Sequence, residues 1–197
     1  MEQAFIESLL SRFHQQDRNA LAQIITIIES SAEKDLAAKR ILLSKLVKDK
    51  IDTIRVAISG PPGVGKSTFI NTLGQAIVDK GYYLSVLPID PSSEYSGGSI
   101  LGDKTRMKEL MAKDKVFIRP SASRGALGGV SLNTFDVMSL VEAFGCNFLL
   151  IETVGVGQSE AMAHALCDHF VLLLQPGSGD FLQSMKKGIL ESADFAL

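Results

Sequence analysis

The first fifty residues carry apolar side chains at helical spacing. In the segment 4–13 (AFIESLLSRF) they recur every three or four positions, which predicts an amphipathic helix. Asp17 and Asn19 stand where a cap would start a second helix, Ala20–Glu29, and the pattern continues into a third helix from about Ala32 to Val47. The charged cluster 48–52 then interrupts the pattern. It predicts the end of a helical layer.

From Arg55 onward, short apolar runs that end in Gly, Pro or Asp alternate with helical stretches. The runs predict strands at 55–59, 83–88, 116–119, 148–152 and 169–174, and the stretches predict helices at 66–80, 104–113, 132–144 and 158–166. Near-continuous apolar runs such as 148–151 indicate strands that are covered on both faces, hence a mostly parallel sheet between helices. The final residues 193–197 (ADFAL) resemble the opening of a further strand.

These two patterns predict an α/β protein in two parts. Residues 1–50 form a helical N-terminal extension, and residues 51–197 form a domain with a mostly parallel sheet flanked by helices. The chain has 197 residues, 46% of them hydrophobic, which is enough for one sizeable core. A fold built from repeats is excluded because no period recurs.

Charge and targeting signals narrow the function. A net charge of −2 argues against a protein whose main task is gripping nucleic acid. No apolar run approaches the roughly 18 residues of a membrane span, and the N-terminus lacks a basic region and a cleavage site. The sequence therefore predicts a cytoplasmic protein with no nucleic-acid or membrane partner.

One motif carries the chemistry. The segment Gly60–Thr68 (GPPGVGKST) fits the P-loop pattern G-x-x-x-x-G-K-[ST], with a strand predicted before it and a helix after it. Glycines let the backbone N–H groups converge on phosphate, Lys66 would reach the β- and γ-phosphates, and Ser67 would bind Mg²⁺. The alternative is a Gly-rich turn beside an exposed lysine. The predicted nucleotide-binding residues are Gly60, Pro61, Pro62, Gly63, Val64, Gly65, Lys66, Ser67 and Thr68.

Acidic residues for the metal and the attacking water should lie at the carboxyl ends of strands. Asp90 and Glu152 each close a predicted strand, and Asp103 lies in a loop rich in Gly and Ser. An acid at a strand end can also be purely structural. The predicted metal ligands are Ser67, Asp90, Asp103 and Glu152, and the predicted catalytic residues are Lys66, Asp90, Asp103 and Glu152.

Five segments in this order resemble the MeaB/ArgK (MMAA-like) group of P-loop GTPases over roughly residues 15–197. They are 60–68, 90–93 (DPSS), 99–107 (SILGDKTRM), 117–129 (FIRPSASRGALGG) and 152–160 (ETVGVGQSE). The group replaces the usual Asp-x-x-Gly of GTPases with Glu-x-x-Gly, as Glu152–Gly155 does.

The resemblance implies a slow GTPase with GTP or GDP and Mg²⁺ as ligands. It implies a chaperone of an adenosylcobalamin-dependent acyl-CoA mutase, typically methylmalonyl-CoA mutase, that gates cofactor loading and protects the mutase. An ArgK-type ATPase or kinase linked to lysine, arginine and ornithine transport is the alternative, and so is a P-loop metallochaperone GTPase. The family is homodimeric, and its dimerisation region is missing here.

By the same resemblance, Lys66 and Ser67 match the phosphate lysine and the Mg²⁺ hydroxyl, and Asp103 lies in a switch I-like loop. The segment 152–160 matches switch II. The segment 175–187 is similar to a mobile loop through which the family communicates with the mutase, although it also fits an ordinary loop with a solvated Lys pair.

The sequence departs from the family at the base-reading motif. Asn-Lys-x-Asp occurs nowhere in the chain, and in the family it should follow 193–197. We therefore expect a truncated chain that cradles phosphates but discriminates bases poorly. A protein that binds nucleotide without turning it over stays open for this reason.

Other candidates have weaker signals. Gln158 could position a water or simply start a helix, and Arg119 or Arg124 could act as an arginine finger or order a loop. A P-loop kinase would need 119–129 as its lid. The three histidines, His14, His164 and His169, form no cluster for a metallochaperone, and Cys146 and Cys167 fit small buried hydrophobes.

Overall fold

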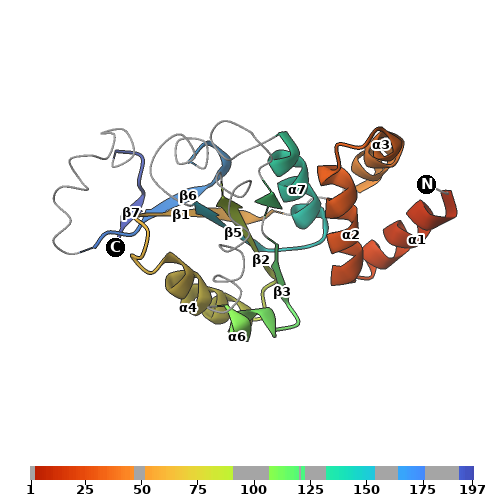
Figure 1. The fold of residues 1–197 in the computed structure, drawn as a ribbon. Helices are drawn as coiled ribbons and strands as arrows, with labels where there is room; N and C mark the ends of the chain where they lie inside the picture. The colour runs from red at the N-terminus through yellow and green to blue at the C-terminus, as the bar shows by residue number, and fades with distance from the viewer. Residues whose placement is uncertain are drawn as a thin grey trace. The chain divides into compact units, whose positions relative to one another are not determined.

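The computed structural model describes residues 3–46, 52–90, 107–119, 121–122, 132–153, 164–175 and 191–197 (Figure 1). The chain divides into two compact units. The first, called here the helical unit, comprises Met1–Thr53 and Leu132–Asn147, and the second, the sheet unit, comprises Ile54–Ser131 and Phe148–Leu197. Each unit is described by itself. The predicted boundary between residues 50 and 51 stays a prediction.

The helical unit contains α1 (Gln3–His14), α2 (Arg18–Glu29), the 3-10 turn η1 (Glu33–Asp35), α3 (Leu36–Leu46) and α7 (Leu132–Ala143). The first three helices follow the apolar periodicity of the sequence. The unit also takes in α7, which lies almost ninety residues further along the chain. Phe13 of α1 stacks edge-to-face on Phe144, just after α7, with ring centroids 5.2 Å apart. Aromatic and aliphatic burial therefore holds this unit together.

A polar cluster fixes the turn between α1 and α2. Asp17 is the N-cap of α2, and its carboxylate accepts a hydrogen bond of 2.8 Å from the backbone N–H of Asn19. Arg12 donates a second bond of 2.8 Å to the same carboxylate. The bond from Arg12, followed by the one from Asn19, lowers the pKa of Asp17 below its usual value. Of the two cap candidates in the sequence, Asp17 is the N-cap and Asn19 its hydrogen-bond donor, and the helix begins two residues earlier than predicted.

The described strands of the sheet unit form one parallel sheet in the order β3-β2-β5-β1-β6-β7, with β4 paired to the end of β2. Their bounds are β1 (Ile54–Ser59), β2 (Leu84–Asp90), β3 (Val116–Ile118), β4 (Ser121–Ala122), β5 (Phe148–Thr153), β6 (His169–Leu172) and β7 (Phe195–Ala196). The α/β class with a parallel sheet is confirmed. The further strand expected in 193–197 is present as β7.

Two aspartates hold neighbouring strands together at the amino end of the sheet. Asp168, directly before β6, accepts a bond of 2.7 Å from the N–H of Arg55 and donates its own N–H to the Arg55 carbonyl at 2.9 Å. Asp194, just before β7, makes the same pair of bonds with Phe170, at 2.7 and 2.9 Å. Each aspartate thus extends the ladder by a side-chain bond, and we call them the strand clamps.

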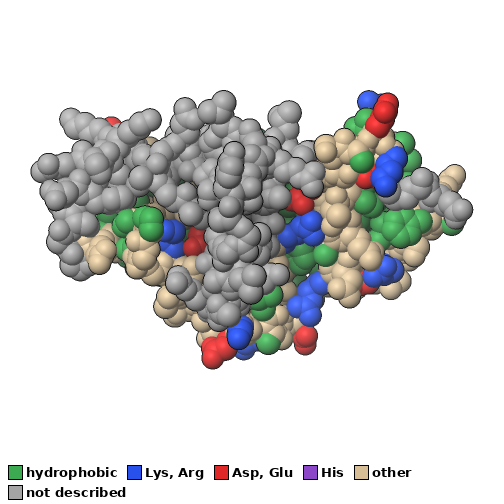
Figure 2. All heavy atoms as spheres, in the orientation of Figure 1, with side chains coloured by type: hydrophobic (Ala, Val, Ile, Leu, Met, Phe, Trp, Pro, Cys, Tyr) green, Lys and Arg blue, Asp and Glu red, His purple; other side chains and the backbone are tan. Residues whose placement is uncertain are grey.

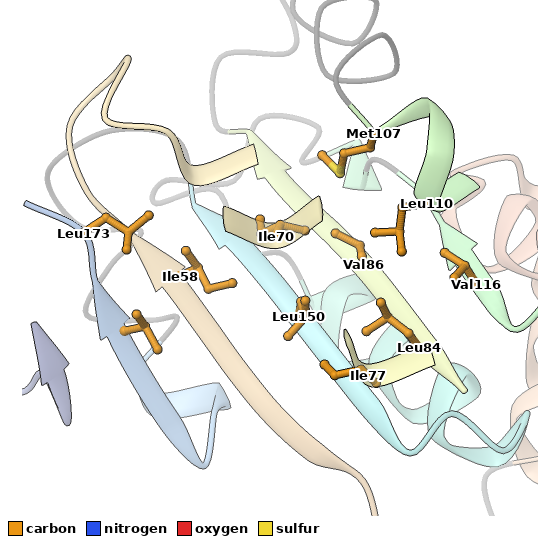
Figure 3. Close-up of a cluster of buried hydrophobic side chains, with 11 residues drawn as sticks. Ile58, Ile70, Ile77, Leu84, Val86, Met107, Leu110, Val116, Leu150 and Leu173 are labelled. Atoms are coloured by element: carbon orange, nitrogen blue, oxygen red, sulfur yellow. The ribbon is translucent and has the colours of Figure 1, made fainter. Parts of the chain in front are cut away.

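Helices α4 (Lys66–Asp79) and α6 (Lys108–Met111) pack on a cluster of buried side chains from five strands (Figure 3). The labelled members include Ile58, Leu84, Val86 and Leu150 of the sheet and Ile70, Ile77 and Leu110 of the helices. At Gly74 the backbone of α4 lies closest to the side chains of β2 and α6. A Cβ there would stand 2.7 Å from the side chain of Leu110 and 2.9 Å from that of Leu84.

Of two further predicted helices, one is shorter in the structure and the other lies mostly outside the described residues. The helix expected at 104–113 is a single turn, Lys108–Met111, and its predicted start lies outside the described residues. Most of the helix expected at 158–166 also lies outside them. Among the helices that the structure describes, none has the length and apolar character to cross a bilayer.

Candidate functional site

The phosphate-binding loop connects β1 to α4. The backbone φ angles of Gly60, Gly63 and Gly65 are 145°, 82° and 104°, values that residues other than glycine rarely adopt. Gly60 has a second constraint, because a Cβ there would stand 2.4 Å from the carbonyl oxygen of Leu173 after β6. The glycines therefore let the loop turn sharply against the neighbouring strand and deliver the chain to the first turn of α4.

Lys66 is the first residue of α4 and is only 8% exposed. Its ammonium group donates hydrogen bonds to the carbonyl oxygens of Gly60, at 2.8 Å, and Pro61, at 2.9 Å. A buried cation is costly unless it is hydrogen-bonded, and these carbonyls stabilise it beside the N-terminus of α4. The loop thus holds a positive charge where helix N–H groups and the helix dipole also favour an anion.

Ser67, in the first turn of α4, is hydrogen-bonded to Glu152, near the end of β5. The Ser67 hydroxyl donates a hydrogen bond of 3.1 Å to the Glu152 carboxylate, and both side chains are buried. Glu152 lies near the end of β5, in register with Ile58 of β1 and Pro88 of β2. The carboxyl ends of parallel strands meet at one edge, so the acid comes to the P-loop although 85 residues separate it from Ser67.

The other two predicted acids are less fully described. Asp90 is the last residue of β2, one position beyond Ile89, which pairs with Thr153 of β5, so its backbone lies at the same sheet edge as Glu152. Asp103 lies outside the described residues. Hydroxyl and carboxylate oxygens are the hard donors that Mg²⁺ takes, so the Ser67–Glu152 pair fits that ion.

A cavity of about 480 Å³ lies beside the P-loop. It is lined by Val64, Gly65, Thr68, Phe69, Thr72, Leu173, Leu174 and Leu197. The sequence analysis missed the residues after β6 and the end of the chain as neighbours of the loop. Their signals were the apolar run at 169–174 and the strand expected at 193–197, and neither indicates which loop the end of the strand faces.

Most of the remaining candidates cannot be placed relative to this site. Gln158, Arg124 and the segment 176–187 lie outside the described residues. Arg119 directly follows β3, and its backbone N–H donates a bond of 3.1 Å to Val86. Within the described part of the chain, no group of three or more His, Cys, Asp or Glu side chains could hold a metal ion.

The two cysteines lie in different units and differ in environment. Cys146 is buried in the helical unit, and burial raises its pKa to about 12. Cys167 is half-buried in the sheet unit, directly before a strand clamp. Burial raises its pKa as well, and the charges of Asp194 and Asp168 raise it further. The sequence predicted two small buried hydrophobes, which is confirmed for Cys146 but wrong for Cys167, because Cys167 is only partly buried.

Comparison with known proteins gives a consistent result. The sequence profile of the family described as methylmalonyl Co-A mutase-associated GTPase MeaB matches residues 21–197. A mouse protein, methylmalonic aciduria type A homolog, mitochondrial, is 45% identical over 206 residues, which cover 100% of this chain and 50% of that protein. GTPase ArgK of Escherichia coli is 41% identical over 194 residues, covering 98% of this chain and 59% of that protein.

A solved structure of a LAO/AO transport system kinase shares the architecture. It has a TM-score of 0.78 and 30% sequence identity, and the match covers 100% of this chain and 56% of that one. The chain therefore spans between half and three fifths of the length of these relatives.

Proposed function

The chain belongs to the MeaB family of GTPases, and from this we propose that it binds and hydrolyses GTP as a chaperone of an adenosylcobalamin-dependent acyl-CoA mutase. The observation that carries the proposal is the P-loop with its buried Lys66 beside the Ser67–Glu152 pair. Such a constellation suits phosphoryl transfer, in which an enzyme mainly positions groups and neutralises charge.

In the proposed reaction the protein's own groups have distinct tasks. Lys66 exchanges carbonyl partners for phosphate oxygens, and the loop N–H groups surround the phosphates. Ser67, Glu152, Asp90 and Asp103 would hold Mg²⁺ directly or through water, and the ion supplies charge neutralisation on the phosphates. Binding must then separate or reorganise the Ser67–Glu152 hydrogen bond, so this pair reports whether the site is filled.

The mutase part of the proposal is supported by the family description, which names methylmalonyl-CoA mutase. GTP hydrolysis would change the shape of the protein against the mutase rather than make a metabolic product. A protein in this role should turn over slowly alone and faster when the mutase is bound.

The first experiment is a calorimetric titration of the 197-residue chain with GDP and with ADP in Mg²⁺. We expect GDP binding that Lys66→Ala weakens by at least tenfold, about 1.4 kcal/mol. Lys80→Ala is the matched control, because Lys80 is exposed at the other end of the same helix. Equal effects of the two substitutions, or no binding at all, would contradict the assignment of the phosphate site. Equal affinity for GDP and ADP would show that the P-loop binds the phosphates without selecting the base, as expected for a sequence without Asn-Lys-x-Asp, whereas GDP binding at least tenfold tighter would show that base selection does not need that motif.

The chaperone role needs a separate measurement. Purified methylmalonyl-CoA mutase is mixed with adenosylcobalamin and the chain, and cofactor loading is followed by its visible absorbance with GTP or GDP present. We expect loading to depend on which nucleotide is bound, and Lys66→Ala to remove that dependence. Loading that is identical with both nucleotides would contradict the chaperone proposal while leaving nucleotide binding intact.

One observation favours a second function. The solved structure named as a transport system kinase is 30% identical to this chain. If the chain acts as a kinase, the labelled γ-phosphate of the nucleotide passes to an acceptor other than water. Release of the label only as inorganic phosphate would exclude this alternative.

A further inference from the structure

The helical unit carries an apolar groove between α1 and α3, separate from the nucleotide site. It has a volume of about 400 Å³ and is lined by Gln3, Ile6, Glu7, Lys34, Ala37, Ala38, Ile41 and Lys45. Ile6 and Ala38 are buried, so they form the floor, whereas Ile41 is 40% exposed. Further large apolar side chains, Phe5 of α1 and Leu36 of α3, are exposed on the same two helices. Figure 2 shows hydrophobic side chains at the surface over the part of the molecule where α1 and α3 lie.

The groove has a positive side. Lys34 lies in η1, directly before α3, and Lys45 lies near the end of α3, eleven positions further on. Neither lysine forms an ion pair with another described residue. Lys39 shows the contrast, because its ammonium group bonds to the Ile28 carbonyl at 2.9 Å and lies 3.7 Å from the Asp136 carboxylate within the unit. The charge of Lys39 is thus neutralised within the helical unit, whereas Lys34 and Lys45 are exposed to solvent.

The opposite side of the groove carries one negative charge, that of Glu7. Gln3 and Glu7 of α1 lie there, and the Gln3 amide donates a hydrogen bond of 3.2 Å to the Glu7 carboxylate. The groove therefore has an apolar floor, one side with two lysines and one side with a single carboxylate. The small side chains Ala37 and Ala38 leave room for a backbone to come close.

We propose that this groove binds one amphipathic α-helix of a partner protein, with acidic side chains about three turns apart flanking its apolar face. A helix laid along α3 would fill the floor with side chains at i, i+3, i+4 and i+7 and place its acids against Lys34 and Lys45. A membrane surface could use the exposed apolar side chains on α1 and α3, and the test below separates it. The floor residues Ile6 and Ala38 are buried in the groove, where the side chains of a helix can reach them, and this favours a helix. The proposal is independent of nucleotide binding.

The test uses the 197-residue chain and a fluorescein-labelled synthetic peptide. The peptide has about fifteen residues, leucines along one helical face and two glutamates about eleven residues apart. A matched peptide carries lysines in place of the glutamates. We expect the acidic peptide to bind at least fivefold tighter at low salt, measured by anisotropy, and the preference to fall as salt is raised.

Variants locate the binding. Lys34→Glu combined with Lys45→Glu should reverse the preference between the two peptides, and Ile41→Asp should weaken both. Arg40→Glu is the matched control, because Arg40 is exposed on α3 outside the groove and should change nothing. Circular dichroism establishes that each variant is folded.

Several outcomes would overturn the proposal. Equal binding of the two peptides, or a preference that survives the double charge reversal, would remove the acidic helix as the occupant. Concentration-dependent dimerisation that Ile41→Asp abolishes would assign the groove to a second copy of this chain. Binding to vesicles containing phosphatidylserine that the double variant abolishes, without any peptide preference, would assign it to a membrane.

Discussion

At the amino end of the parallel sheet the carboxylates of Asp168 and Asp194 accept bonds from backbone N–H groups, whereas at the carboxyl end Glu152 accepts a bond from the side chain of Ser67. The partners differ in what they can do. A backbone N–H in a strand is fixed by the ladder, but a serine hydroxyl rotates and can bind something else. The same chemical group therefore stabilises the fold at one end and serves an exchangeable site at the other.

Burial sharpens the contrast between the two ends. Glu152, Ser67 and Lys66 are all buried, so their charges and hydroxyl lie in a medium where electrostatic interactions are strong. The strand clamps Asp168 and Asp194 are exposed to solvent, which screens them. Substitutions at the carboxyl end should thus change ligand binding most, and substitutions at the amino end should change only stability.

The largest expected effect is on the P-loop backbone. Gly60→Ala places a Cβ 2.4 Å from the Leu173 carbonyl oxygen at a φ of 145°, and we expect it to lower the free energy of unfolding by about 3 kcal/mol or more. Gly63→Ala is the control, because a Cβ there meets nothing within 4 Å and only the positive φ is strained. Its cost should be about 1 kcal/mol. Urea unfolding without nucleotide measures both, and equal costs would show that the contact with Leu173 is not limiting.

Next in size is the effect of Glu152 on ligand binding. Glu152→Gln keeps an oxygen that can accept from Ser67 but removes the charge, so we expect GDP affinity in Mg²⁺ to fall about tenfold, about 1.4 kcal/mol. Asp168→Asn makes the same chemical change at the opposite end and should leave GDP affinity unaltered. Titration calorimetry on both variants tests this. A loss of affinity in Asp168→Asn as well would erase the distinction between the two ends.

A smaller effect is expected at the strand clamps. Asp168→Ala removes the acceptor for the Arg55 N–H, and we expect a loss of about 1 kcal/mol in the free energy of unfolding. Asp194→Ala should cost less, because it joins β6 to the two-residue strand β7. Asn at either position retains an acceptor oxygen and serves as the control. A larger loss in nucleotide affinity than in stability would show that the clamps act on the site.

The smallest effect concerns the thiol of Cys167. Burial raises its pKa, and the negative charges of Asp194 and Asp168 add to that rise. Asp194→Asn removes one charge and favours the thiolate, so the pH profile of alkylation by iodoacetamide should move to lower pH by less than about 0.5 unit. The measurement uses a Cys146→Ala background, so that Cys167 is the thiol that reacts. A profile that moves to higher pH would contradict the electrostatic explanation.

The sequence predicted those parts of the fold that local pattern encodes. The apolar runs located β1, β2, β5 and the start of β6, and the Gly-Lys-Ser spacing located the turn between β1 and α4. The meeting of Ser67 and Glu152 was also accessible, because strand ends of a parallel sheet share an edge. Their roles in catalysis and metal binding, like those of Asp90 and Asp103, stay predictions.

Other features depend on contacts that a local pattern does not contain. Asp168 and Asp194 each precede an apolar run. The sequence pattern of an acid next to a strand is the same whether the carboxylate binds a backbone N–H or a metal ion. The approach of the Leu173 carbonyl to Gly60 involves no side-chain signal at all. The grouping of α7 with α1, α2 and α3 in one compact unit depends on packing between segments about ninety residues apart, which helical periodicity cannot report.

The close packing at Gly74 affects the position of the whole of α4, including the end that carries Lys66. Gly74 touches no part of the P-loop, yet it lies eight residues from Lys66, about 12 Å along the helix axis. A methyl group there would push against Leu84 and Leu110, and the rigid helix would carry part of that displacement to its phosphate-binding end. The accuracy with which this protein places its lysine is thus set two turns away, by a residue that has no side chain.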